Sequence, residues 1–118
     1  MFALTKSMNY YLCPGYTDMR RGIYSLYQMV KTQMKRNPVS DEVFIFLGKT
    51  RRQIKILHWE NDGFILYHKK LEKGTYELPV YSSLEDRYHI GWQTFVLMLE
   101  GVGMRSATFR KRFEISVK

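Results

Sequence analysis

Hydrophobic and polar positions along the chain predict four β-strands. These strands cover residues 8–13, 43–47, 53–60 and 64–70. The stretch 43–47 is apolar at every position, so we expect it to be a central strand that is buried on both faces. Asn61-Asp62-Gly63 joins the last two stretches, and Asp-Gly between such runs predicts a β-hairpin. Residues 75–78 predict a short fifth strand, which ends at Pro79.

A spacing of three to four residues between apolar positions predicts two helices. The first extends from Thr17 to Asn37-Pro38 and has about 17 residues with one apolar face. Thr17 suits the N-cap position, and the helix dipole favours a negative charge such as Asp18 in the first turn. The second helix carries its apolar stripe at 92–99, and Gly101 is suited to close it.

The order of these elements predicts an α+β fold. We expect a small antiparallel β-meander of four or five strands packed with two helices. A chain of 118 residues supports one sizeable core, so residues 1–118 are expected to form a single domain. A basic C-terminal tail at about residues 104–118 either adds an edge strand at 113–117 or becomes ordered on a partner.

Composition points to a soluble protein with anionic partners. The chain has 19 Lys and Arg against 11 Asp and Glu, a net charge of +8 that favours association with polyanions. Cys13 is the single cysteine, which rules out a disulfide within the chain and fits a reducing compartment. The sequence shows neither a signal-peptide pattern nor an apolar run long enough to span a bilayer. We therefore expect a cytoplasmic protein that does not contact membranes.

Groups for catalysis are sparse in the sequence. His58 and His68 lie on neighbouring predicted strands, and with Cys13 or Glu60 they are a candidate metal site. We interpret these histidines as polar residues at the surface of a sheet. No glycine-rich loop opens a helix to cradle phosphate, and no serine or cysteine has the setting of a nucleophile. The expectation is a protein that is not an enzyme and needs no metal or cofactor.

The segment 49–73 is the strongest candidate for a binding surface, because it combines a hairpin with many cations. Long cationic side chains beside a turn reach a phosphate backbone, and aromatic side chains stack on unpaired bases. The alternative is a solvated charged turn above an ordinary aromatic core. The predicted phosphate contacts are Arg51, Arg52, Lys55, Lys69 and Lys70, the predicted stacking groups are Trp59 and Tyr67, and a second basic set comprises Arg20, Arg110, Lys111 and Arg112.

Several motifs in this chain occur in the order known from one family. They are YLCP at 11–14, TDMRRG at 17–22, FIF at 44–46, RRQIKILHWE at 51–60, MLEG at 98–101 and RKRF at 110–113. Over about residues 8–113 the chain resembles the small TnpB-type accessory proteins that are encoded beside the transposase in bacterial insertion sequences of family sixty-six. The RNA-guided nucleases that share the TnpB name are much longer and carry a carboxylate nuclease site that this chain lacks.

The resemblance implies a non-catalytic role in DNA transposition, beside a separately encoded transposase. It supplies no catalytic residue to carry over. The expected partners are transposon-end DNA, the transposase, or both, and the DNA is expected to bind through the basic hairpin. Whether the protein also forms a homo-oligomer is left open.

Two other functions remain as alternatives. One is an adaptor that binds the transposase without contacting DNA. The other is a metal-dependent nuclease that uses Asp18 or Glu60 with His58 and His68.

Overall fold

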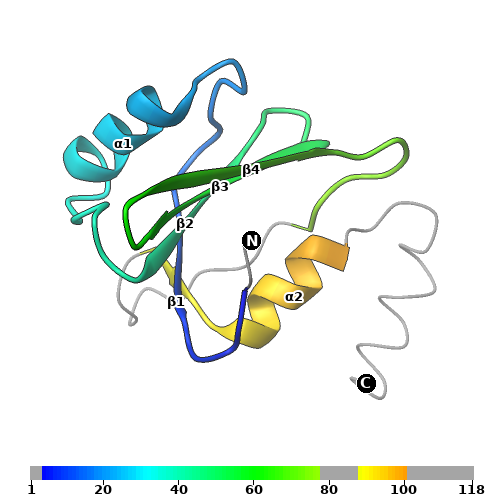
Figure 1. The fold of residues 1–118 in the computed structure, drawn as a ribbon. Coiled ribbons are helices and arrows are strands. Elements are labelled where there is room, and N and C mark those ends of the chain that lie inside the picture. The colour runs from blue at the N-terminus through cyan, green and yellow to red at the C-terminus, as the bar shows by residue number, and fades with distance from the viewer. Residues whose placement is uncertain (1–3, 78–87, 101–118) are drawn as a thin grey trace.

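The computed structural model describes residues 4–77 and 88–100, and these residues form one mixed β-sheet with a helix on each face (Figure 1). The strands lie in the order β4-β3-β2-β1-β5. Along the chain the elements are β1 (Asn9–Leu12), α1 (Ile23–Thr32), β2 (Glu42–Leu47), β3 (Gln53–Glu60), β4 (Gly63–Lys70), β5 (His89–Ile90) and α2 (Trp92–Glu100).

The predicted α+β fold is confirmed, but the sequence did not predict that β1 pairs with β2 on one side and with β5 on the other. β2, β3 and β4 form an antiparallel meander, in which Phe44 is opposite Leu57 and Leu57 is opposite Leu66. β1 joins β2 in parallel, with Tyr11 opposite Phe44. Parallel neighbours need a crossover connection, and α1 provides it between β1 and β2. The sheet is therefore mostly antiparallel but mixed.

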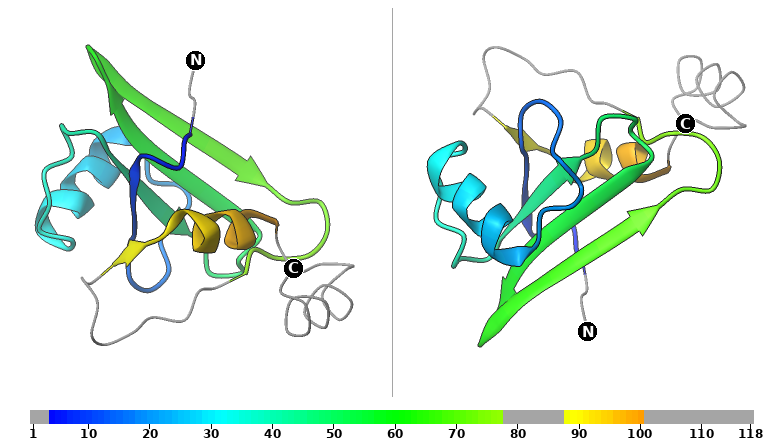
Figure 2. Two further views of the ribbon diagram at one scale, coloured as in Figure 1. Left: turned by 90° about the horizontal axis from the view of Figure 1, so that it is seen from below. Right: turned by 90° about the horizontal axis from the view of Figure 1, so that it is seen from above.

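Both faces of the sheet are covered, because each helix packs on one face (Figure 2). β2 is the middle strand of five, and its residues 43–47 are almost fully buried, which confirms the prediction of a central strand. The core on the α1 face contains Tyr11, Phe44, Phe46, Leu57, Leu26, Met29 and Val30. The core on the α2 face contains Tyr10, Leu12, Val43, Ile45, Ile54, Ile56, Phe95 and Met98.

The β3–β4 hairpin is confirmed, whereas the position of the fifth strand was predicted wrongly. Asn61 and Asp62 form the turn, and Asn61 has a φ of 59°, a backbone conformation that asparagine adopts more readily than most residues. Residues 75–77 are not in a strand. The Tyr76 amide instead donates to the Arg51 carbonyl at 2.7 Å, and the Glu77 amide to the Met98 carbonyl at 3.2 Å. The fifth strand is β5, and residue 78 lies outside the described part.

The first helix begins at Ile23, so the predicted start at Thr17 and Asp18 was wrong. The Thr17 amide donates to the Leu47 carbonyl at 2.8 Å, which continues the pairing of β1 with β2 past the end of the strand. Gly22 is the residue before the helix, and its backbone is extended. The helix also ends earlier than expected, at Thr32, and has 10 residues. The second helix was predicted correctly, although Gly101 lies outside the described residues.

Candidate nucleic-acid interface

The turn between β2 and β3 carries the first group of predicted contact residues. Its backbone is closed by two hydrogen bonds, from the Gly48 amide to the Gln53 carbonyl at 3.0 Å and from the Arg51 amide to the Gly48 carbonyl at 2.9 Å. Arg51 is half-buried and has a φ of 61°. Lys49 and Arg52 are exposed. The backbone of the turn is thus held by hydrogen bonds, and its cationic side chains extend from it.

The end of β4 lies against this turn. The Leu71 amide donates to the Arg52 carbonyl at 2.8 Å, and the Arg52 guanidinium donates to the Glu72 carbonyl at 3.3 Å. Lys69 and Lys70 are exposed, and they project to opposite faces because successive residues of a strand alternate. The cations of the turn and of the strand end therefore surround one end of the hairpin.

Arg20 comes to the same place from a distant part of the sequence. A shallow groove of about 320 Å³ is lined by residues 17–20 on one side and by Gly48, Lys49, Thr50 and Gln53 on the other. The contact is close, since a Cβ added at Gly48 would lie 2.8 Å from Met19 Cγ. The name basic corner is used below for six cations from these three segments, Arg20, Lys49, Arg51, Arg52, Lys69 and Lys70.

Asp18 holds Arg20 through an ion pair. Its carboxylate accepts hydrogen bonds from the Arg20 backbone amide at 2.9 Å, from Nε at 3.0 Å and from Nη2 at 2.7 Å. These bonds hold the pKa of Asp18 well below its usual range. The Arg20 side chain is 91% exposed, so its guanidinium is oriented by Asp18 and still faces solvent. An acid that stays ionised and paired is poorly suited to proton transfer.

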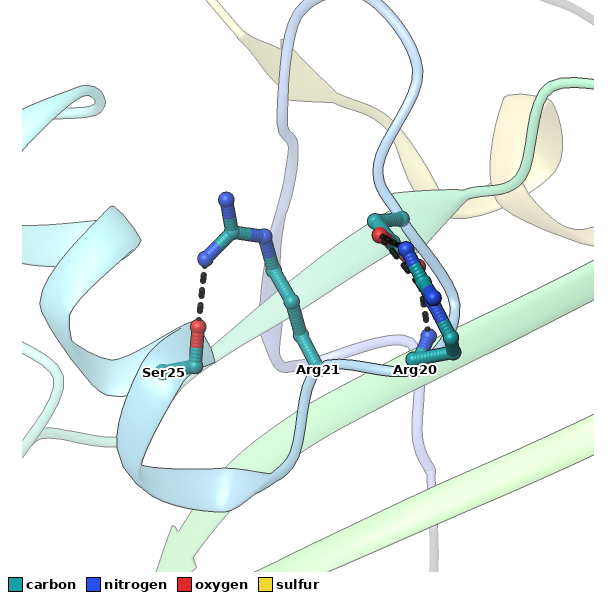
Figure 3. Close-up of polar contacts among 4 residues, drawn as sticks. Arg20, Arg21 and Ser25 are labelled. Carbon is teal, nitrogen blue, oxygen red and sulfur yellow. Dashed lines mark hydrogen bonds and ion pairs between the residues drawn. The ribbon is translucent and has the colours of Figure 1, made fainter.

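Arg21 points to a different partner from Arg20 (Figure 3). Its Nη1 donates to Ser25 Oγ at 2.6 Å, which places the guanidinium over the first turn of α1. The Arg21 carbonyl accepts a hydrogen bond of 2.6 Å from Lys55 Nζ. The two neighbouring arginines therefore serve two separate regions of the surface.

Lys55 is poorly placed for the phosphate contact that the sequence predicts. Its side chain points toward α1 from β3, and the residue is only 7% exposed. The ammonium group is occupied by the Arg21 carbonyl at the start of α1. Burial of Lys55 depends on where the helix packs, which the local sequence does not reveal. Lys55 therefore fastens α1 to the sheet.

The two predicted stacking groups lie on opposite faces of the sheet. Trp59 is opposite Phe64, whereas Tyr67 is opposite Ile56, and this register puts Trp59 on the α1 face and Tyr67 on the α2 face. Trp59 is half-buried, with its ring centroid 5.0 Å from that of Phe64. Tyr67 is more exposed. One nucleic-acid strand on one face cannot stack on both.

Two aromatic residues that were not among the predicted contact groups lie on the α1 face, where Tyr24 is exposed and Tyr27 is half-buried. Tyr24 and Tyr27 line a groove of about 420 Å³ together with Ile23, Gln28, Lys31 and Phe64. Tyr24 was missed because it lies off the apolar stripe of the predicted helix. A large aromatic residue beside such a stripe is itself a signal for a contact surface.

The candidate metal site is not assembled in the described structure. His58 lies on the α2 face and His68 on the α1 face, since His68 is opposite Lys55 and His58 is opposite Ile65. His68 Nε2 contacts Gln53 Oε1 at 2.8 Å. Burial, together with the Lys55 charge, lowers the pKa of His68. Within residues 4–77 and 88–100, no three His, Cys, Asp or Glu side chains form a group that could hold a metal ion.

Cys13 is a buried free thiol, as its sequence context suggested. Burial raises the pKa of the thiol. A thiol that remains protonated is a weak nucleophile.

Arg110, Lys111 and Arg112 lie outside the described residues, as do the tail at 104–118 and the edge strand expected at 113–117. Neither of the described helices is long and apolar enough to cross a membrane.

The fold and the surface define a small α+β protein that gathers cations from three segments at one end of a hairpin. The chain belongs to the family described as IS66 Orf2 like protein, whose model matches residues 8–108. That family makes it an insertion-sequence accessory protein. The match includes Arg20 and the whole hairpin, so the basic corner lies within the family region.

Two curated relatives, both from Sinorhizobium fredii (strain NBRC 101917 / NGR234), are similar to part of the chain. Uncharacterized protein y4hO is 30% identical over 74 residues, which are 63% of this chain and 64% of the relative. Uncharacterized protein y4jC is 27% identical over 85 residues, which are 72% of this chain and 71% of the relative. No solved structure matches the chain.

Proposed function

We propose that this insertion-sequence accessory protein binds transposon DNA through the basic corner and acts beside a separately encoded transposase, without catalysis, in the cytoplasm. The observation that carries the proposal is the meeting of three distant basic segments at one end of the hairpin. The loop after β1 contacts the β2–β3 turn through Met19 and Gly48, and the end of β4 is bonded to the same turn through Leu71 and Arg52.

The geometry suits the DNA backbone better than a small anion. All of these cations except Arg51 are exposed, and they are spread around the end of a hairpin. A small anion is usually held in a concave site by a few converging donors. Phosphates spaced along a strand match a spread of cations, and each contact releases a counterion. Such contacts supply affinity and position but little sequence information. The basic corner is thus proposed to hold DNA while other groups or partners select the site.

The test compares two double variants that change the net charge equally. Lys49→Gln/Lys70→Gln removes two cations from the basic corner, and Lys6→Gln/Lys35→Gln removes two exposed lysines from outside it. Binding to a labelled transposon-end duplex and to an unrelated duplex is measured by fluorescence anisotropy at several salt concentrations. For the corner variant we expect the slope of log K against log salt to become shallower by about 2.

The control variant is expected to keep the wild-type slope, since distant charges are screened within about 10 Å at ordinary salt. Equal losses of DNA affinity in both variants would mean that only the net charge matters. That result would contradict a specific DNA-binding role for the basic corner. Tighter binding of the transposon end than of the unrelated duplex would add sequence recognition. No binding by the wild-type protein at low salt would refute direct DNA contact.

A transposase adaptor without DNA contact is the second candidate, and the exposed side chains of Ile23 and Tyr24 on α1 favour it. Its signature would be capture of the purified transposase together with an absence of DNA binding. Under that function the Lys49→Gln/Lys70→Gln variant would capture the transposase as well as the wild type does.

A further inference from the structure

A row of four aromatic rings extends from α1 to the tip of the hairpin. The rings of Tyr24 and Tyr27 are nearly parallel, with an interplanar angle of 8° and centroids 6.3 Å apart. Tyr27 meets Phe64 edge to face at 5.6 Å, and Phe64 meets Trp59 in the same way at 5.0 Å. The name aromatic row is used below for Tyr24, Tyr27, Phe64 and Trp59.

The exposed end of the row is not required for the core. α1 packs on the sheet through Leu26, Met29 and Val30, which are buried. Tyr24 is 75% exposed, and its neighbour Ile23 is also exposed. Together with Tyr27 and Phe64 they line the open groove of about 420 Å³. Apolar surface that is exposed and grouped around a groove usually marks a contact site.

The charges at this groove are positive. Lys31 lies with Nζ 5.4 Å from the centroid of the Tyr27 ring, and it is one of the groove-lining residues. Arg21 is exposed beside the first turn of the same helix. None of the six described residues that line the groove carries a carboxylate. Aromatic faces combined with cations complement a ligand that has flat rings and negative charges.

We propose that the aromatic row is a binding site for single-stranded DNA, in which unpaired bases stack on Tyr24 and Tyr27 while Lys31 and Arg21 contact the adjacent phosphates. Bases inside a duplex have both faces covered by their neighbours, so only an unpaired base offers a free face to Tyr24. Stacking of this kind is tolerant of sequence and is strengthened by nearby cations. The inference rests on the proposed DNA-binding function and adds the strand type that the basic corner does not distinguish.

The test uses two probes of equal length, a labelled oligodeoxythymidine strand and a labelled duplex. Tyr24→Ala is expected to weaken binding of the single strand by about 5- to 100-fold, the loss of one stacked base. Binding of the duplex is expected to change less than about twofold, because phosphate contacts at the basic corner are untouched. Tyr24→Phe keeps the ring and should bind the single strand as the wild type does.

Tyr16→Ala is the matched control, since it removes another exposed tyrosine that does not line the groove. Thermal unfolding of each variant verifies that the fold is kept, which is expected because Tyr24 is mostly exposed. Equal loss of single-strand binding in Tyr16→Ala and Tyr24→Ala would overturn the proposal. So would unchanged single-strand binding in Tyr24→Ala.

Failure of this inference can be separated from failure of the proposed function. If Lys49→Gln/Lys70→Gln weakens duplex binding while Tyr24→Ala leaves single-strand binding intact, the stacking site is refuted and DNA binding stands. If the wild type binds neither probe, the function itself is refuted. If Tyr24→Ala reduces capture of purified transposase but not single-strand binding, the groove is a protein-binding surface and the single-strand proposal is refuted.

Discussion

At the scale of single residues, the two most deeply buried tyrosines differ in how their hydroxyl groups are accommodated. The Tyr10 hydroxyl donates to the Thr5 carbonyl at 2.7 Å. The Tyr76 hydroxyl is buried and has no hydrogen-bond partner among the described residues. A buried polar group without a partner costs about 1–3 kcal/mol of stability. Removal of the hydroxyl oxygen is therefore expected to change the stability of the protein in opposite directions at Tyr10 and Tyr76.

Tyr76→Phe is expected to raise the free energy of unfolding by about 1 kcal/mol, because the variant removes an unpaired buried hydroxyl and keeps the ring. Tyr10→Phe loses a hydrogen bond and should lower the free energy by about 1 kcal/mol. Urea unfolding of both variants at neutral pH measures the two effects. A loss of stability in Tyr76→Phe would show that its hydroxyl is hydrogen-bonded.

The same tyrosines predict a loss of stability at high pH. Burial raises the pKa of Tyr10 to about 12 and that of Tyr76 to about 12. The unfolded chain releases these protons near pH 10, so the folded state binds more protons between pH 10 and 12. Stability is complete below pH 10 and falls above it by about 1.4 kcal/mol per pH unit for each tyrosine.

Urea midpoints measured from pH 9 to 11.5 check this pH dependence. Tyr76→Phe should make the decline shallower, since one of the two groups is removed. A decline of the same steepness in that variant would assign the alkaline transition to other groups.

At the scale of elements, the contact between the loop after β1 and the β2–β3 turn holds the basic corner together. Gly48 is buried, and a Cβ there would lie 2.8 Å from Met19 Cγ and 3.6 Å from the Gln53 carbonyl oxygen. Gly63 meets nothing within 4 Å and begins β4. These two glycines have backbone φ values outside the left-handed region, so an added methyl group tests contact and not backbone strain.

Gly48→Ala is therefore expected to destabilise the protein by about 1–3 kcal/mol, because the side chain of Met19 must move away from the turn. The same movement displaces Arg20 and should weaken duplex binding. Gly63→Ala should change both quantities little. Thermal unfolding and DNA-binding anisotropy of the two variants provide the comparison. Equal stability of the two variants would show that the Met19 side chain moves aside without a loss of stability.

Four of the five strands were predictable from the sequence, whereas β5 and the start of the first helix were not. The hairpin and the central strand are local patterns of alternation and continuous apolar residues, and the structure follows them closely. Thr17 also looked like a good N-cap, but its amide bonds to Leu47, a residue thirty positions away. The contact between these distant segments outweighed the local preference of Thr17 for an N-cap position. Local sequence patterns do not reveal such a contact, because its two partners are far apart in the chain.

The positions of the candidate site residues were likewise predictable only in part. Opposite faces for Trp59 and Tyr67 follow from the register of a hairpin with a two-residue turn, so the sequence already contained this information. Burial of Lys55 depends on the packing of α1 and was not accessible. The approach of Arg20 to the turn was also hidden, since it depends on the fit of Met19 against Gly48.

At the scale of the whole molecule, the basic corner lies at the open end of the β3–β4 hairpin, and the aromatic row meets the hairpin near its turn, at Trp59 and Phe64. Gln53 marks the corner and Trp59 the row, and six residues of strand at about 3.3 Å each separate them by roughly 20 Å. Lys55 fastens the start of α1 to β3 between the two regions, at 2.6 Å from the Arg21 carbonyl. The two surfaces are therefore connected through one hairpin, to which Lys55 fastens α1.

This arrangement predicts a preference for DNA that offers a duplex and a single strand together. A duplex with a single-stranded extension can engage both surfaces, and the second contact then forms at a high effective concentration. We expect it to bind at least about tenfold tighter than a blunt duplex of the same paired length. In Tyr24→Ala the advantage of the extension should disappear, while the Tyr16→Ala control should retain it. Competition between the two DNAs in an anisotropy assay measures the ratio directly. Equal affinity for both in the wild type would mean that one DNA molecule does not reach from the corner to the row.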